Sequence, residues 1–233
     1  SEQDIRPLRV VVLNLMPLKI TTETDLVRLL SNTPLQVELD FMKIKGHTPK
    51  NTPIEHMKEF YKDFDEMQDD FYDGMIITGA PVEQMPFEEV NYWEEVTEIF
   101  DWARTHVTST LYICWAAQAA MYHFYGVKKQ LLPEKMFGVF KHKINEDNIK
   151  LLRGFDDEFF VPHSEANHLN AQDVVESLVS SAKDISIATF QCFEGGNKLM
   201  IKDEIVANLI YEIQTKLEMI EKLLPMAFEY EGQ

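Results

Sequence analysis

The stretch TSTLYICWAAQAAMYHFY (Thr108–Tyr125) joins two structural patterns at a single cysteine. Thr108–Cys114 is rich in β-branched and apolar residues, which predicts a buried strand. Trp115–Tyr125 is rich in alanine, which predicts a helix that ends at Gly126. Cys114 therefore stands where a strand turns into a helix.

Upstream of this stretch, strand patterns alternate with helical patterns along the chain. The predicted strands are Arg9–Leu15, Leu35–Ile44 and Gly74–Thr78, and the predicted helices are Thr22–Ser31, Ile54–Phe64 and Tyr92–Thr105. Strands that are separated by helices pair in parallel through crossover connections. The sequence therefore predicts an α/β fold with three layers and a mostly parallel, doubly wound sheet.

Downstream of Gly126 the patterns are less regular. We predict shorter strands at Phe137–Ile144, Phe159–Pro162, Ile185–Phe193 and Lys198–Ile201, with Gly195–Asn197 as the hairpin turn before the last of them. Glu204–Leu224 carries a continuous apolar stripe at helical spacing, which suits a core helix or an oligomer contact. No change of composition marks a linker, so residues 1–233 are expected to form a single domain.

Composition excludes several classes of protein. The 233 residues include 22 Lys and Arg against 39 Asp and Glu, a net charge of −17, and 45% of them are hydrophobic. That hydrophobic content excludes a disordered chain, and the charge disfavours nucleic acid and anionic membranes as partners. No apolar stretch approaches the roughly 20 residues that span a bilayer. We expect a cytoplasmic protein whose two cysteines, Cys114 and Cys192, remain thiols.

Cys114 is the residue whose position suggests chemistry. The carboxyl edge of an open α/β sheet is where such folds bind ligands. Helix N–H groups at that edge lower a thiol pKa and stabilise a developing oxyanion, as acyl transfer through a cysteine requires. A small buried hydrophobic residue is the alternative, since unpaired cysteines are often buried. Position alone leaves both interpretations open.

Other patterns are weaker. The acidic run Asp63–Asp70 is more typical of a solvated helix face than of a cation site. His163 and His168 lie five residues apart without a nearby cysteine, so no zinc site is predicted. Nucleotide-binding glycine motifs are absent from the sequence. We therefore predict neither a metal nor a bound cofactor.

Several segments carry a long, collinear resemblance to a known family. They are LNLMPLK (Leu13–Lys19), LLSNTPLQVE (Leu29–Glu38), TGAPVEQMPFEEVNYWEE (Thr78–Glu95), HVTSTLYICWAAQAA (His106–Ala120), LPEKMFGVF (Leu132–Phe140) and RGFDDEFFVPHS (Arg153–Ser164). These segments resemble the homoserine O-acyltransferases of methionine biosynthesis. The resemblance implies a fold like that of class I glutamine amidotransferases, which is flavodoxin-like. It also implies small-molecule substrates, acetyl-CoA as the co-substrate and a homodimer.

The resemblance assigns roles around the cysteine. Cys114 matches the nucleophile that takes the acyl group, and the backbone N–H groups of Trp115 and Lys19 match the oxyanion hole. Glu83 matches a position where acetyl-CoA users have Glu and succinyl-CoA users have Gly. A carboxylate there occupies the space of a succinyl tail and repels its charge.

Two further residues match positions that contact the amino-acid substrate. Lys135 is suited to pair with a carboxylate and Ser164 to donate a hydrogen bond to it. A solvated lysine and a turn serine are the alternatives.

The catalytic base is where the sequence departs from the family. The family supplies a His and a Glu in a segment resembling GHPEY, which this sequence does not contain. Three interpretations stay open: His163 or His168 is a substitute base, the chain is a degenerate paralogue that acts by binding, or a segment of the protein is missing from this sequence.

Overall fold

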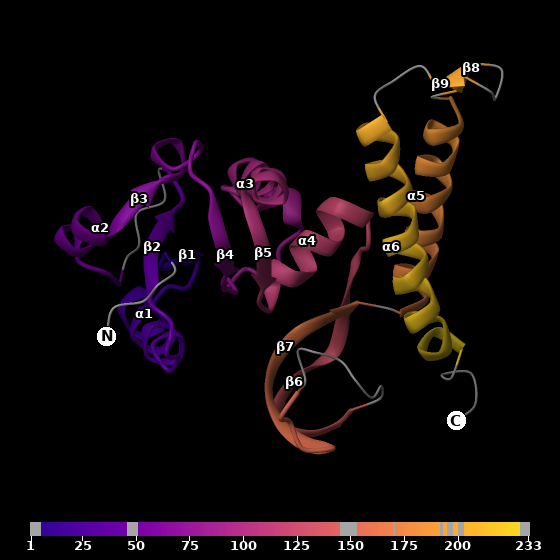
Figure 1. Cartoon of the computed structure of the whole chain (residues 1–233). Coiled ribbons are helices and arrows are strands. Elements are labelled where there is room, and N and C mark those ends of the chain that lie inside the picture. The colour runs from indigo at the N-terminus through magenta and orange to yellow at the C-terminus, as the bar shows by residue number, and fades with distance from the viewer. Residues whose placement is uncertain are drawn as a thin grey trace.

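Five strands form one parallel sheet in the computed structural model, which describes residues 6–45, 51–144, 153–169, 171–191, 193–194, 198–199 and 203–228. They are β1 (Leu8–Leu13), β2 (Val37–Lys43), β3 (Tyr61–Asp63), β4 (Tyr72–Ile77) and β5 (Val107–Tyr112), in the order β3-β2-β1-β4-β5. From β1 the chain moves towards one edge of the sheet, and from β4 it moves towards the other. Right-handed crossovers then place α1 (Lys19–Leu30) and α3 (Trp93–His106) on opposite faces (Figure 1). The predicted doubly wound α/β fold is confirmed.

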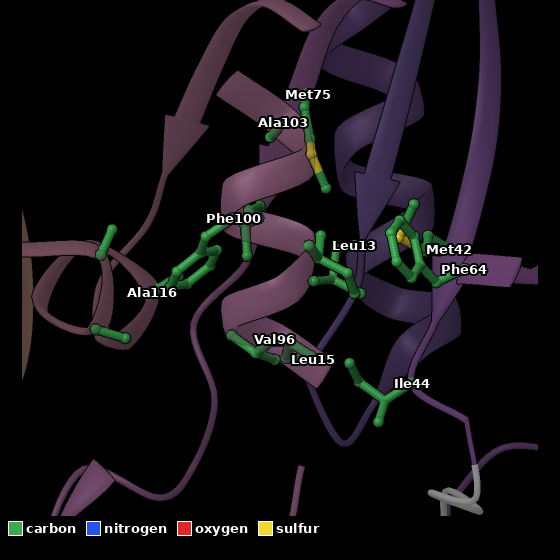
Figure 2. Close-up of a cluster of buried hydrophobic side chains, with 14 of the residues drawn as sticks. Leu13, Leu15, Met42, Ile44, Phe64, Met75, Val96, Phe100, Ala103 and Ala116 are labelled. Atoms are coloured by element: carbon green, nitrogen blue, oxygen red, sulfur yellow. The ribbon is translucent and has the colours of Figure 1, made fainter. Parts of the chain in front are cut away.

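The α3 helix covers one face of the sheet through a continuous apolar stripe. Val96, Ile99, Phe100 and Ala103 recur at helical spacing and are at most 2% exposed. In Figure 2 the side chains of this stripe point towards Leu13 of β1 and towards Ala116 in the next helix. Burying each large apolar side chain contributes about 1.5–3 kcal/mol, so this layer holds the strand ends in place.

The α4 helix (Trp115–Tyr125) has the bounds that the sequence predicts. Its N-cap residue is Cys114, and it ends at Gly126, whose left-handed φ of 69° suits a residue without a Cβ. The Gly126 N–H donates to the Tyr122 carbonyl at 2.8 Å and closes the last turn.

Beyond α4 the chain leaves the sheet as a two-stranded antiparallel ribbon, which we call the arm. It consists of β6 (Lys129–Lys143) and β7 (Glu158–Leu169), with a register shift between Leu131 and Met136. Figure 1 shows the arm as a curved hook that extends away from the sheet. Phe137, Val139 and Phe160 are between 67% and 79% exposed, so the arm has little core of its own.

Two predicted elements are wrong. The strand predicted over Ile185–Phe193 is wrong up to Gln191, because Ala171–Gln191 forms helix α5, which packs against α6 (Asp203–Phe228). The β-branched residues of this segment favour a strand locally. The buried residues Val174, Leu178 and Ala182 form a helical stripe in α5, and their packing overrides that local preference. The predicted helix Ile54–Phe64 ends at Phe60 as α2, and the next residues form β3 because they pair with β2.

Short elements complete the fold. The turns Phe64–Glu66 and Phe87–Glu89 are 3₁₀ helices, and β8 (Phe193–Glu194) pairs in antiparallel fashion with β9 (Lys198–Leu199). The predicted turn Gly195–Asn197 and Cys192 lie outside the described residues. None of the helices among the described residues is long and apolar enough to cross a membrane. The single-domain assignment of residues 1–233 stays a prediction.

Candidate functional site

Cys114 occupies a sharp turn between β5 and α4. Its φ of 54° and ψ of −118° are outside the regions that side chains favour, and among the described residues it is the one non-glycine residue with positive φ. Such backbone strain costs about 1–3 kcal/mol and is concentrated at functional sites. A strained strand-to-helix turn exposes the nucleophile of many α/β enzymes, and the Cys114 side chain is exposed here. The alternative of a buried hydrophobic cysteine is therefore wrong.

The loop that follows β4 makes room for this turn at Gly79. A Cβ atom on Gly79 would lie 3.2 Å from the Cys114 Cβ and 3.7 Å from its Sγ. The contact with Cβ would be tighter than nine in ten real Cβ contacts, whereas the contact with Sγ would be an ordinary one. The glycine of the GAPVE segment therefore lets the cysteine turn sit against β4.

Three loops meet at the carboxyl edge of the sheet. The Thr78 N–H donates to the Leu13 carbonyl at 3.1 Å, and the Ile113 N–H donates to the Ile77 carbonyl at 3.0 Å. The Leu15 N–H then donates to Thr78 Oγ1 at 2.8 Å. These bonds align the ends of β1, β4 and β5, so the loops that follow them open on the same edge as Cys114.

The backbone donors predicted for the oxyanion hole lie at two helix starts on this edge. Trp115 is the first residue of α4 and Lys19 is the first residue of α1. N–H groups at these positions have no carbonyl one turn earlier in the helix, so they are available to an anion. The structure brings both to one sheet edge, and their joint action on an oxyanion stays a prediction.

Asn14 holds the loop that carries Lys19. Its Nδ2 donates to the Lys19 carbonyl at 3.3 Å, and its Oδ1 accepts the Met16 N–H at 3.1 Å. Lys19 Nζ in turn donates to the Asn14 carbonyl. Asn14 and Lys19 are 1% and 4% exposed, and burial lowers the pKa of Lys19 to about 8 despite the nearby Glu23 carboxylate.

A polar cluster beneath this loop was not predicted. Tyr61 donates to Glu23 and accepts from Asn14 Nδ2 at 2.9 Å, while His56 Nε2 lies 2.7 Å from Glu23 Oε2. Burial and the Glu23 carboxylate raise the pKa of Tyr61 well above its usual range. Asn14 directly follows a buried strand, which is the one sequence signal that pointed here.

The GAPVE loop approaches the arm through Glu83. Glu83 Oε1 accepts from Lys135 Nζ at 3.1 Å, so two predicted substrate residues contact each other. The Glu83 carbonyl accepts from Lys129 Nζ at 2.6 Å and from Asn167 Nδ2. Both strands of the arm are therefore bonded to this loop, and burial lowers the pKa of Lys129.

The other predicted residues lie on β7. Ser164 is exposed and pairs in register with Phe137, two positions along the strand from Lys135. His163 Nε2 lies 2.8 Å from His142 Nε2 within the arm. His168 lies at the base of the arm next to Asn167, whose carbonyl accepts from Gln118 Nε2 of α4 at 3.2 Å. Of the two histidines, His168 is thus on the segment that contacts the cysteine helix.

Metal ligands do not cluster in the part of the chain that the structure describes: it holds no group of three or more His, Cys, Asp or Glu side chains placed to bind an ion. The described residues of the candidate site are a strained thiol, two helix N-termini and an ion pair. An exposed thiol next to free N–H donors is the kind of arrangement that covalent acyl transfer requires.

A protein family and several individual proteins match this chain in sequence. The family model described as homoserine O-succinyltransferase matches residues 1–201. The chain is 81% identical over 176 residues to a homoserine O-acetyltransferase of Parabacteroides distasonis, which covers 76% of this chain and 57% of that protein. It is 68% identical over 191 residues to a protein of the same name from Bacteroides fragilis, covering 80% and 63%.

A solved structure is similar at lower identity. A glutamine amidotransferase from Thermotoga maritima aligns with a TM-score of 0.48 and 12% identity, covering 96% of this chain and 99% of that one. The chain spans less than two thirds of the length of the curated relatives that it matches.

Proposed function

The chain belongs to the homoserine O-succinyltransferase family, and on this premise we propose that it transfers an acyl group from acyl-CoA to the hydroxyl of homoserine. The observation that carries the proposal is the strained, exposed Cys114 at the start of α4. Relatives up to 81% identical that bear the name homoserine O-acetyltransferase support the same reaction, a step of methionine biosynthesis.

The first half-reaction forms a thioester on Cys114. The thiolate attacks the carbonyl carbon of acyl-CoA, the new S–C bond forms, and the CoA thiolate leaves. The negative oxygen of the intermediate accepts hydrogen bonds from the Trp115 and Lys19 N–H groups. The positive end of α4 favours both the thiolate and this oxyanion.

The second half-reaction releases the product. The homoserine hydroxyl attacks the thioester carbon while a base takes its proton, and Cys114 leaves as the thiolate. Lys135 and Ser164 hold the substrate carboxylate from the arm. His163 or His168 acts as the base, with His168 favoured because it directly follows Asn167, whose carbonyl accepts a hydrogen bond from Gln118 of α4. Loss of a catalytic base costs on the order of 10⁴ in rate, so this residue decides the turnover.

Glu83 favours acetyl over succinyl donors in this proposal. Its carboxylate is 26% exposed, lies beside Lys135 and would repel the terminal carboxylate of a succinyl group. The names of the relatives point the same way. Replacing Glu83 with Gly should therefore raise the rate with succinyl-CoA relative to acetyl-CoA.

Two assays decide between turnover and binding alone. The protein is mixed with acetyl-CoA, and intact mass is measured before and after adding homoserine, with Cys114→Ser as the control. An acetyl adduct on the wild type that homoserine removes supports the transferase. The competing candidate is a degenerate paralogue that binds a ligand or partner, because His163 is already engaged with His142. That candidate predicts no adduct.

A homodimer is part of the same proposal. Ile205, Ile210 and Leu217 on α6 are about half exposed, which leaves apolar surface on this helix. A second copy covering that surface would give twice the 27.1 kDa chain mass in light scattering. A mass of one chain at micromolar concentration would exclude it.

A further inference from the structure

A line of side chains extends from Cys114 along one face of α4. Cys114, Gln118 and Tyr122 follow one another at intervals of four residues, so they line one side of the helix. At a rise of 1.5 Å per residue, this line extends about 12 Å from the thiol to the phenol.

A cavity of about 340 Å³ opens at the far end of this line. Tyr122, Phe87 and Leu131 form apolar parts of its wall, and Tyr122 and Phe87 stack with ring centroids 5.0 Å apart. Lys128 and Lys129 also line it, against the single carboxylate of Glu88. The charged side chains of the wall thus sum to +1, in a chain whose net charge is −17.

The three charged groups of the wall have different surroundings. Glu88 accepts the Tyr122 hydroxyl, which lowers the pKa of that carboxyl. Lys129 Nζ donates to the carbonyls of Glu83 and Met85 and lies 4.5 Å from the Phe87 ring centroid. Lys128 is exposed at the rim. Lys128 is therefore the cation best placed to meet an incoming anion.

Between the thiol and the cavity lies a buried acceptor. Gln118 Oε1 is buried and has no hydrogen-bond partner among the described residues, although Nε2 of the same amide donates to the Asn167 carbonyl at 3.2 Å. Buried polar atoms in native structures are nearly always bonded, so an exception calls for a partner that would complete the hydrogen bond. This acceptor calls for an N–H donor about one helical turn from Cys114.

We propose that this path binds the CoA portion of the acyl donor. The proposal rests on the acyl-transfer function proposed above. The thioester lies at Cys114, an amide N–H of the pantetheine arm donates to Gln118 Oε1, the arm passes over the Phe87–Tyr122 stack, and the phosphates pair with Lys128. A thioester carbonyl, an amide and a phosphate follow one another along CoA in the order in which the thiol, the acceptor and the cation follow one another here.

The test compares a full donor with a truncated one. Acetyl-CoA and S-acetyl-N-acetylcysteamine both carry the thioester and the first amide, but only acetyl-CoA carries phosphates. The rate of Cys114 acetylation at subsaturating donor is measured by intact mass for the wild type, Lys128→Ala, Gln118→Leu and the control Lys58→Ala. Lys58 is an exposed lysine of α2, so its replacement changes the charge equally without touching the cavity.

Each variant has its own expected signature. Lys128→Ala should slow acetylation by acetyl-CoA about tenfold and leave the truncated donor unchanged, as for the loss of one charge-assisted hydrogen bond. Gln118→Leu should slow both donors, and Lys58→Ala neither. Equal effects of Lys128→Ala on both donors, or no effect on either, would overturn the proposal.

The experiment distinguishes failure of the proposed acyl transfer from failure of the proposed CoA path. If the wild type forms no adduct with either donor, acyl transfer is excluded for this chain, and binding of radiolabelled CoA by equilibrium dialysis then tests the path alone. Roughly tenfold weaker binding to Lys128→Ala than to Lys58→Ala would support the path. Undetectable binding to the wild type, or equal affinity of the two variants, would overturn it.

Discussion

The parallel sheet with its helices and the arm hold opposite parts of the candidate site and are built in opposite ways. At the centre of the sheet, Val11, Val12 and Leu13 are fully buried. In the arm, Phe137 is 79% exposed and Phe160 is 69% exposed. The sheet therefore places Cys114, the predicted nucleophile, on packed elements, whereas the arm presents its polar residues on a ribbon with little core. In the proposed function, the chemical step that needs fixed geometry is thus separated from contacts that adapt to a substrate.

The two regions differ in charge as well. Residues 128–169, which include the arm, contain seven Lys and Arg and seven Asp and Glu, a net charge of zero. The charge of −17 is therefore carried by the rest of the chain. The proposed substrates, acyl-CoA and an amino acid, carry anionic groups, and these would meet the least repulsion on the arm side of the site.

The largest expected effect tests packing in the two regions. Phe100→Ala should lower the free energy of unfolding by about 3–5 kcal/mol, because this fully buried ring leaves a cavity under α3. Phe137→Ala should change it by about 0.5 kcal/mol or less, because the ring is mostly in solvent. Urea unfolding followed by circular dichroism measures both. Equal losses would mean that the arm is packed against something in solution.

The second prediction concerns the buried Lys19, whose lowered pKa makes the free energy of unfolding depend on pH. The native pKa of Lys19, about 8, lies below its value of 10.5 in an unfolded chain. Between these pH values the unfolded state holds the proton and the native state does not, so stability rises with pH there. The difference between the wild type and Lys19→Met should rise by about 1.4 kcal/mol per pH unit in that window. A flat difference would show that the ammonium group is solvated.

The contrast also explains what the sequence could predict. The strand β4 and the helix α3 follow from an apolar run and from helical periodicity, because burial decides the structure of both. Cys114 was found because a strand pattern and a helix pattern meet at one residue. The conformation of Ile185–Phe193 was not predictable, since packing against α6 overrides the local β-branched preference.

Contacts between distant segments account for the rest of what was missed. The ion pair of Lys135 with Glu83 joins residues 52 positions apart, and the hydrogen bond that Asn14 donates to Tyr61 spans 47 positions. Periodicity describes which face a residue occupies, and it contains no information on which remote side chain lies opposite. The resemblance supplied Lys135 and Glu83 as separate positions, and their mutual contact came from the fold.

A smaller effect tests how firmly the sheet holds its loop. Asn14→Ala removes the side chain that bonds both ends of the Asn14–Lys19 loop. The limiting rate of Cys114 acetylation should fall about tenfold, while the half-saturating acetyl-CoA concentration stays constant, because an oxyanion contact acts only in the transition state. Asn32→Ala, an exposed asparagine after α1, is the control. A rise in the half-saturating concentration alone would contradict this role.

The smallest expected effect concerns how strongly the Lys135–Glu83 ion pair holds the arm to the sheet region. Lys135 and Glu83 form their ion pair while 47% and 26% exposed. Partly exposed pairs contribute about 0.2–1 kcal/mol and weaken with salt, because water and ions screen them. A double-mutant cycle of Lys135→Met and Glu83→Gln should give a coupling in that range. The coupling should decline between 0.05 and 0.5 M NaCl, because the screening length falls about threefold over that range. A coupling above about 2 kcal/mol that salt does not change would mean that the pair is buried in solution. The arm would then be a fixed wall of the site, and the separation between rigid nucleophile and adaptable contacts would no longer hold.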